Sequence, residues 1–248
     1  MGQQLLFTYG GHCLDKEIQG FRTLAVTGRE ELTQDIDDVD LASNGALYLS
    51  ARLKQKTLKI SFFLRCSTLS ERHLVTAKLK QLLLARNTTV NFSDDSLYHY
   101  IGSVSKLEVD KTTLSSTGSI EIELSDPYSY SETQILSGTG TTVKFNSSYG
   151  ETGFSNKPIM IEFTPSASIT TFQITSNQQK KFILNQAVSA GKKIVINFDK
   201  LTCTVAELNV LADVSLNSNF ADFEINHDTV ITFNTSGSYT IRFEVKKL

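Results

Sequence analysis

Near the middle of the chain, a strand pattern stops at a proline. From Ile120 to Leu124, apolar and acidic side chains alternate, which is the period of a strand with one face in a core and the other in water. Pro127 has no amide hydrogen to give to a sheet, and it favours extended backbone at the residue before it. Serine and glycine residues continue to Gly140, after which the alternation resumes. The pattern predicts a linker at about 125–140 between two domains, 1–131 and 132–248.

The second half of the chain reads almost entirely as short strands. Apolar residues alternate in segments separated by turn residues, at 143–145, 158–163, 171–174, 181–184, 193–198, 230–233 and 239–245. Seven or more short strands of this kind predict a β-sandwich or jelly roll. The single candidate for a helix in this half is the segment 205–212.

The first half combines strands with one clear helix. Strand alternation at 58–64 puts four apolar side chains on one face, which predicts a strand against a core. Thr68 and Glu71 have the spacing of a capping box. The apolar residues that follow recur at helical spacing until the pattern ends near Asn87: Val75, Leu79, Leu82 and Leu83. We therefore expect an amphipathic helix packed on a sheet.

An acidic segment precedes the strand at 58–64. Residues 29–45 are polar, and Asn44-Gly45 at their end is the commonest dipeptide of tight hairpins. The sequence predicts a long β-hairpin arm here, and the alternative is a mobile, solvated loop. Its acidic flank consists of Glu30, Glu31, Asp35, Asp37, Asp38 and Asp40.

Composition and charge exclude several classes of protein. The 24 Lys plus Arg residues are outnumbered by 26 Asp plus Glu, so no excess positive charge is available to bind nucleic acid without regard to sequence. No stretch of about 20 apolar residues could span a bilayer, and the N-terminus lacks a secretion signal, so we expect neither membrane insertion nor ordinary export.

No catalytic, cofactor or metal site is expected. Cys13, Cys66 and Cys203 are widely spaced and odd in number, which favours free thiols over disulfides or a zinc site. The four histidines are isolated, and the acidic run lacks the glycine and glutamate positions of a calcium loop. Asp95 and His99 lie four residues apart on an expected strand, too far apart for a catalytic cluster. The chain is therefore not expected to be an enzyme.

Four segments of the first half resemble the distal tail protein (Dit) family of bacteriophages with long, non-contractile tails. They are LKISFFL, ERHLVTAKLKQLLLA, VNFSDDSLYHYIGSV and GSIEIELSDPYSYS. Asp126, Pro127 and Tyr128 resemble the Asp-Pro-Tyr at the end of the family's ring-forming domain. NKPIMIEF, SAGKKIVINF and YTIRFEVKKL resemble its galectin-like sandwich, although FEINHDTVITF stands where a Gly-Asn turn is expected.

The resemblance implies a mainly β protein with two parts. The first is a ring-forming β-sandwich-like domain with one α-helix and a hairpin arm, and the second is a galectin-like β-sandwich. It further implies a hexameric ring, single or as two stacked rings, around the DNA channel at the virion tail tip, with synthesis in the host cytoplasm. Such a ring is a hub that joins the tail tube protein to the tail-associated and receptor-binding components of the tip, with DNA only as passing cargo.

Two further questions stay open at this level. The arm and its six carboxylates are expected at a subunit contact or the channel wall, or form a plain solvated face. A competing function is a monomeric carbohydrate-binding adhesion module, which the absence of tryptophan disfavours because sugars stack on large aromatic faces.

Overall fold

The computed structural model describes residues 4–110, 113–146 and 153–248. The chain is mainly β and divides into two compact units, Met1–Ser129 and Tyr130–Leu248. Each unit has its own cluster of buried apolar side chains. Within the described ranges, no helix is long and apolar enough to cross a membrane.

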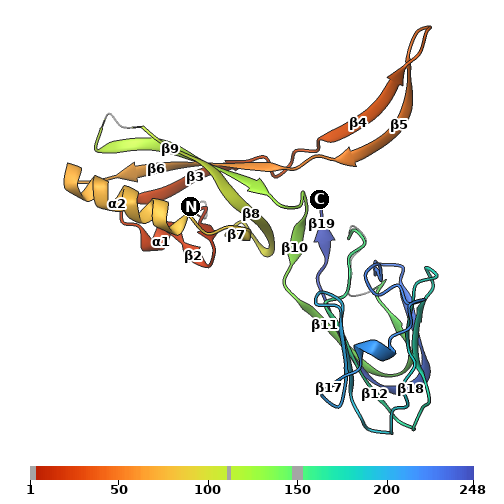
Figure 1. Cartoon of the computed structure of the whole chain (residues 1–248). Helices are drawn as coiled ribbons and strands as arrows, with labels where there is room; N and C mark the ends of the chain where they lie inside the picture. Colours follow the sequence, from red (N-terminus) through yellow and green to blue (C-terminus); the bar gives the residue numbers. More distant parts are fainter. Residues whose placement is uncertain (1–3, 111–112, 147–152) are drawn as a thin grey trace. The chain divides into compact units, whose positions relative to one another are not determined.

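The first unit is built on one antiparallel sheet with the strand order β2-β1-β7-β8-β9-β6-β3 (Figure 1). Their bounds are β1 Phe7–Tyr9, β2 His12–Cys13, β3 Phe21–Thr27, β6 Thr57–Arg65, β7 Thr88–Phe92, β8 Asp95–Val109 and β9 Ser115–Leu124, with a short helix α1 at Leu14–Glu17. The predicted alternations are confirmed, since every second residue of 58–64 and of 120–124 is buried.

The helix α2, Leu69–Leu82, begins where the capping pattern places it. The Thr68 hydroxyl accepts a hydrogen bond from the Glu71 amide at 3.1 Å, while the Glu71 carboxylate accepts one from the Ser67 amide at 2.6 Å. Leu79 and Leu83 are buried in the same core as the strands. The helix ends five residues before Asn87, whose φ of +47° does not fit a helix.

The hairpin arm is formed by β4, Gln34–Asp40, and β5, Ala46–Leu53. These two strands pair with each other as a separate two-stranded sheet. In Figure 1 the arm extends away from the main sheet of the first unit, and none of its residues is in that unit's core cluster. This confirms the arm that the sequence predicts.

The second unit is a β-sandwich-like fold around a core rich in phenylalanine. Its strand order is β14-β13-β18-β12-β15-β16-β17, and β11 also pairs with β18. The bounds are β11 Gln134–Lys144, β12 Met160–Pro165, β13 Phe172–Ser176, β14 Lys181–Leu184, β15 Ile194–Asn197, β16 Thr202–Val205, β17 Leu208–Asn209 and β18 Val230–Phe243, with a 3-10 turn η1 at Leu211–Asp213. Near the unit boundary, β10 is Ser129–Ser131 and β19 is Lys246–Lys247, and the Ser131 amide donates to the Val245 carbonyl at 2.9 Å.

Two expectations for the second unit are wrong. The segment 205–212 is not a helix, because Ala206 and Glu207 have φ of +48° and +70° and form the two-residue turn between β16 and β17. The segments 230–233 and 239–245 are not separate strands, since β18 runs through Gly237 between them. A Cβ at Gly237 would lie 2.3 Å from the Thr164 carbonyl oxygen, so this glycine allows close strand approach and does not mark a turn.

The predicted linker also overlaps a strand. Residues 134–140 belong to β11, which pairs with β18 from Gln134↔Phe243 to Gly140↔Gly237. Gly138 is needed there because a Cβ would lie 2.5 Å from the Tyr239 hydroxyl of the neighbouring strand. Gly138 is therefore a site of close packing within a sheet, whereas Gly140, with φ of +130° and open space at its Cβ position, lies at the register shift between Gly140 and Thr142.

Candidate functional site: the hairpin arm and its root

The arm exposes both of its faces. Residues 34–53 are all exposed except the half-buried Asp35 and Leu53. Its large apolar side chains stay in water: Ile36 is 60% exposed, Leu47 55% and Tyr48 62%. An isolated two-stranded hairpin is marginally stable in water, so an ordered arm with exposed apolar side chains is typical of a segment that binds another surface.

The end of the arm differs from the predicted tight turn. Five residues, 41–45, connect the strands, and the Leu41 amide donates to the Gly45 carbonyl at 3.1 Å. Asn44 and Gly45 are the last two residues of this loop, and the φ of +102° at Gly45 is the conformation that glycine supplies. The register shifts between Asp37 and Asp38, so Leu49 has no direct partner across the hairpin.

The six carboxylates of the arm segment do not form one acidic face. Side chains alternate along β4, so Asp35 and Asp37 lie on one face and Asp38 and Asp40 on the other. Glu30 and Glu31 precede β4, in the segment that leads into the arm. The structure therefore places the carboxylates along the arm but distributes them around it.

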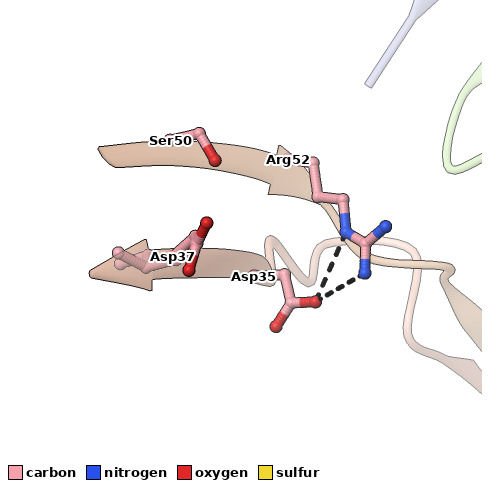
Figure 2. Close-up of a pocket in the computed structure, with 5 residues that line it drawn as sticks. Asp35, Asp37, Ser50 and Arg52 are labelled. Atoms are coloured by element: carbon pink, nitrogen blue, oxygen red, sulfur yellow. Dashed lines mark hydrogen bonds and ion pairs between the residues drawn. The ribbon is translucent and has the colours of Figure 1, made fainter. Parts of the chain in front are cut away.

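Asp35 is the carboxylate that is neutralised within the arm. Arg52 donates from its Nη2 to Asp35 Oδ2 at 3.0 Å (Figure 2). Lys54 Nζ lies 3.4 Å from Asp35 Oδ1. The hydrogen bond from Arg52 and the charge of Lys54 lower the pKa of Asp35. Among the described residues, no cation lies within 4.0 Å of the other three aspartates of β4.

A shallow pocket on the arm is lined by Asp35, Ile36, Asp37, Ser50 and Arg52. Figure 2 shows Asp37 and Ser50 on the neighbouring strands, beside the Asp35–Arg52 pair. Within the described ranges, no group of three or more potential ligands could hold a metal ion. The pocket is thus a polar surface on the arm.

A charged clamp fixes the root of the arm to the main sheet. The Arg29 guanidinium donates two hydrogen bonds to the Asp94 carboxylate, at 3.0 and 2.6 Å, and lies 5.1 Å from the centre of the Phe92 ring. On the returning strand, the buried Lys56 donates from Nζ to the Arg29 carbonyl at 3.1 Å. Arg29 lies before the arm, Lys56 lies after it, and Asp94 lies between β7 and β8 of the main sheet. Because all three are joined at Arg29, we expect this clamp to orient the arm where it leaves the sheet.

Gly28 lets the two backbones of the root approach each other. Its φ is +94°, and a Cβ there would lie 2.2 Å from the Thr57 carbonyl oxygen. Sequence reasoning did not predict the pairing of Arg29 with Asp94. The sequence shows only that Arg29 stands beside Gly28 before an acidic segment. This does not identify Asp94, which is distant in sequence, as its partner.

Asp94→Asn is expected to lower the free energy of unfolding at pH 7 by about 0.5–1 kcal/mol, since Asp94 is partly exposed and the pair is screened by solvent. Arg29 holds the pKa of Asp94 below its ordinary value. The stabilisation is therefore present above the unfolded pKa of about 3.9 and is lost as the pH falls through the lower folded pKa. Chemical denaturation from pH 7 to pH 3 should show that the difference in the free energy of unfolding between wild type and Asp94→Asn becomes smaller as the pH falls.

The matched control is Asp95→Asn, on the neighbouring residue, for which no salt bridge is found among the described residues. The role of the clamp would be contradicted if both variants lost the same free energy of unfolding at pH 7. It would also be contradicted if the loss in Asp94→Asn did not change with pH.

The cysteines and the boundary motif, which were also singled out in the sequence, have roles in packing or local structure. Cys66 and Cys203 are buried free thiols, as expected, while Cys13 is half-buried. Burial raises the pKa of Cys203 to about 12, which suits a packing role. In the boundary motif, the Asp126 carboxylate accepts a hydrogen bond from the Tyr128 amide at 3.1 Å, which forms a local turn around Pro127.

The comparisons with known proteins agree with this architecture. Residues 152–246 match the family of siphovirus-type tail components over its C-terminal domain. A search of curated proteins finds no match. The crystal structure of Dit from phage SPP1, called a paradigm of the hub adsorption apparatus in phages that infect Gram-positive hosts, has a TM-score of 0.81 at 13% identity, covering 98% of this chain and 99% of that chain.

Two structures of the phage p2 baseplate in its activated conformation are also similar. The one with calcium has a TM-score of 0.56 at 10% identity and covers 100% of this chain and 99% of that chain. The one with strontium has a TM-score of 0.51 at 11% identity, with 97% coverage of both chains. At these identities the likeness shows the fold. Residues 152–246 therefore match the siphovirus-type tail component family, and the whole chain has the fold of Dit.

Proposed function

We propose that six copies of this protein form the ring of a phage tail hub around the DNA channel. This hub joins the tail tube to the tail tip and its receptor-binding components. Residues 1–131 form the ring and residues 132–248 the outer, galectin-like domain, with Asp126, Pro127 and Tyr128 at the end of the ring domain. A structural role in a phage tail is supported by the similar proteins, which are hub and baseplate components. The ring, its channel and its lack of enzymatic activity are our proposal.

The observation that carries the ring is the arm. It is a hairpin with exposed apolar side chains at Ile36, Leu47 and Tyr48, and its two strands form a sheet separate from the main sheet of the first unit. If the arm binds a different surface on a neighbouring copy, the contacts are head-to-tail, and such contacts close into rings when the rotation permits.

The carboxylates of the arm segment are compatible with a subunit contact or with the wall of a DNA channel. DNA passing through a channel must not be held, and negative side chains repel phosphate over about 8 Å at physiological salt. Glu30, Glu31 and the aspartates of β4 would serve either position. A fully solvated arm is the alternative that the measurements below would reveal.

The competing function, a carbohydrate-binding module, is not favoured by the second unit. Its phenylalanines, such as Phe163, Phe172 and Phe233, are buried and pack on one another, with ring centres 4.6–6.1 Å apart. Rings inside a core cannot stack on a sugar.

The mass of the purified protein in solution tests the ring. Light scattering at tens of micromolar protein should give six or twelve times the mass of the 27.5 kDa chain. The mass should depend on salt concentration, because charged side chains contribute to the contact. A monomer at every protein and salt concentration would contradict the proposal, and saccharide binding by that monomer would favour the adhesion module.

A further inference from the structure

A second surface of the first unit has the properties of a docking site. A groove of about 580 Å³ lies between α2 and β8. The helix contributes Leu69, Arg72, His73, Thr76 and Lys80, and the strand contributes Leu107 and Val109. Its floor is apolar, its helix side is cationic, and no acidic side chain lines it among the residues that the structure describes.

Two side chains that line the groove, Arg72 and Lys80, are cationic. Arg72 is buried, and its guanidinium donates to the carbonyl oxygens of Asp110 and Thr113, which orient it without neutralising its charge. Lys80 is exposed, and no salt bridge is found for it among the described residues. Leu69 at the end of the groove is 67% exposed.

The arm complements this groove in charge and in polarity. Within the described part of the chain, no cation lies within 4.0 Å of Asp37, Asp38 or Asp40, which lie next to the exposed Ile36 and Val39. An anionic, partly apolar strand pair opposite a cationic, partly apolar groove is the pattern of complementary interfaces.

The arm cannot occupy the groove of its own molecule. The β6 strand begins at Thr57, beside the root of the arm, and ends at Arg65, shortly before α2 begins. Nine residues of strand separate the two by about 30 Å. The arm projects away from the sheet at the end opposite to α2 (Figure 1). A groove of this kind that the arm occupies must therefore belong to another copy.

We infer that the arm of one copy docks in the groove between α2 and β8 of a second copy. The contact is head-to-tail, so each copy uses its arm on one side and its groove on the other, and repetition closes a ring. This inference rests on the proposed ring function and identifies the surface that receives the arm.

Cysteine cross-linking of the full chain tests the pairing. In a Cys13→Ser background, Val39→Cys is placed on the arm and Thr76→Cys in the groove. Oxidation should produce a ladder of covalent dimers and larger species on a non-reducing gel. The control combines Val39→Cys with Lys106→Cys, on β8 but on the opposite face from Leu107. The groove pair should cross-link about tenfold faster than the control, because docking raises the local thiol concentration.

A charge substitution gives a second readout. Lys80→Glu should raise the Kd for assembly about two- to fivefold, as expected for one exposed ion pair. Arg86→Glu, an exposed residue outside the groove with the same charge change, should leave it unchanged.

The outcomes separate this inference from the ring itself. An oligomer of wild-type mass that cross-links equally in the two cysteine pairs, or in neither, overturns the arm-groove contact and leaves the ring standing. A wild-type monomer under all conditions overturns both. A ladder restricted to the groove pair, together with weakening by Lys80→Glu alone, supports the contact.

Discussion

Removal of the arm is expected to convert the proposed oligomer into monomers without unfolding either unit. Thr33 and Lys54 are already joined across the base of the arm by a backbone hydrogen bond of 2.9 Å. Residues 34–53 can therefore be replaced by Asn-Gly, which closes a short hairpin at that point. No residue of the core cluster is lost. If the arm carries the subunit contact, the Kd for assembly should rise on the order of a hundredfold or more.

Sedimentation velocity gives the mass of the variant, and circular dichroism and thermal unfolding show that it is folded. A charge-only control replaces Asp37, Asp38 and Asp40 by Asn. It should assemble more weakly than wild type and with less dependence on salt, since the apolar part of the contact remains. An arm-deleted protein that keeps the wild-type mass would exclude the arm from the interface.

Phe163→Ala is expected to lower the free energy of unfolding of the second unit by about 3–5 kcal/mol. Phe163 is 1% exposed, and its ring centre lies 4.8 Å from Phe172 and 4.6 Å from Phe233. The cavity would therefore open among aromatic rings that cannot easily fill it. Since the first unit has a separate core, its own unfolding should be unaffected.

Differential scanning calorimetry distinguishes the two units. We expect one transition to move to lower temperature while the other stays in place. The control Leu216→Ala removes a leucine that is fully exposed and should shift neither transition. A single transition that moves as a whole would show that the two units unfold together, against the proposed independence of residues 1–131 and 132–248.

Local patterns were sufficient to predict the elements whose signals are periodic. The alternation of Ile120, Ile122 and Leu124 and the capping residues Thr68 and Glu71 each reflect one strand face or one helix end, and the structure contains both. The arm was predicted because an acidic, turn-containing segment preceded a core strand. These features depend on neighbours within a few residues.

Features that depend on distant partners were not predictable. The glycines at 138 and 237 resemble turn residues in sequence, and their reason lies on other strands, at Tyr239 and at Thr164. The clamp between Arg29 and Asp94 joins residues 65 positions apart. The groove receives residues from α2 and β8, and neither segment indicates it alone. The clamp and the groove therefore form only when segments distant in sequence come together in the folded unit.

The central position of β18 determines when the second unit can fold. This strand pairs with β11, β12 and β13, yet all other strands of its sheet precede it in the chain. During synthesis from the N-terminus, those strands leave the ribosome before the strand that joins them exists. The unit should therefore fold late and slowly through non-local pairing, with exposed strand edges that favour aggregation until β18 is released.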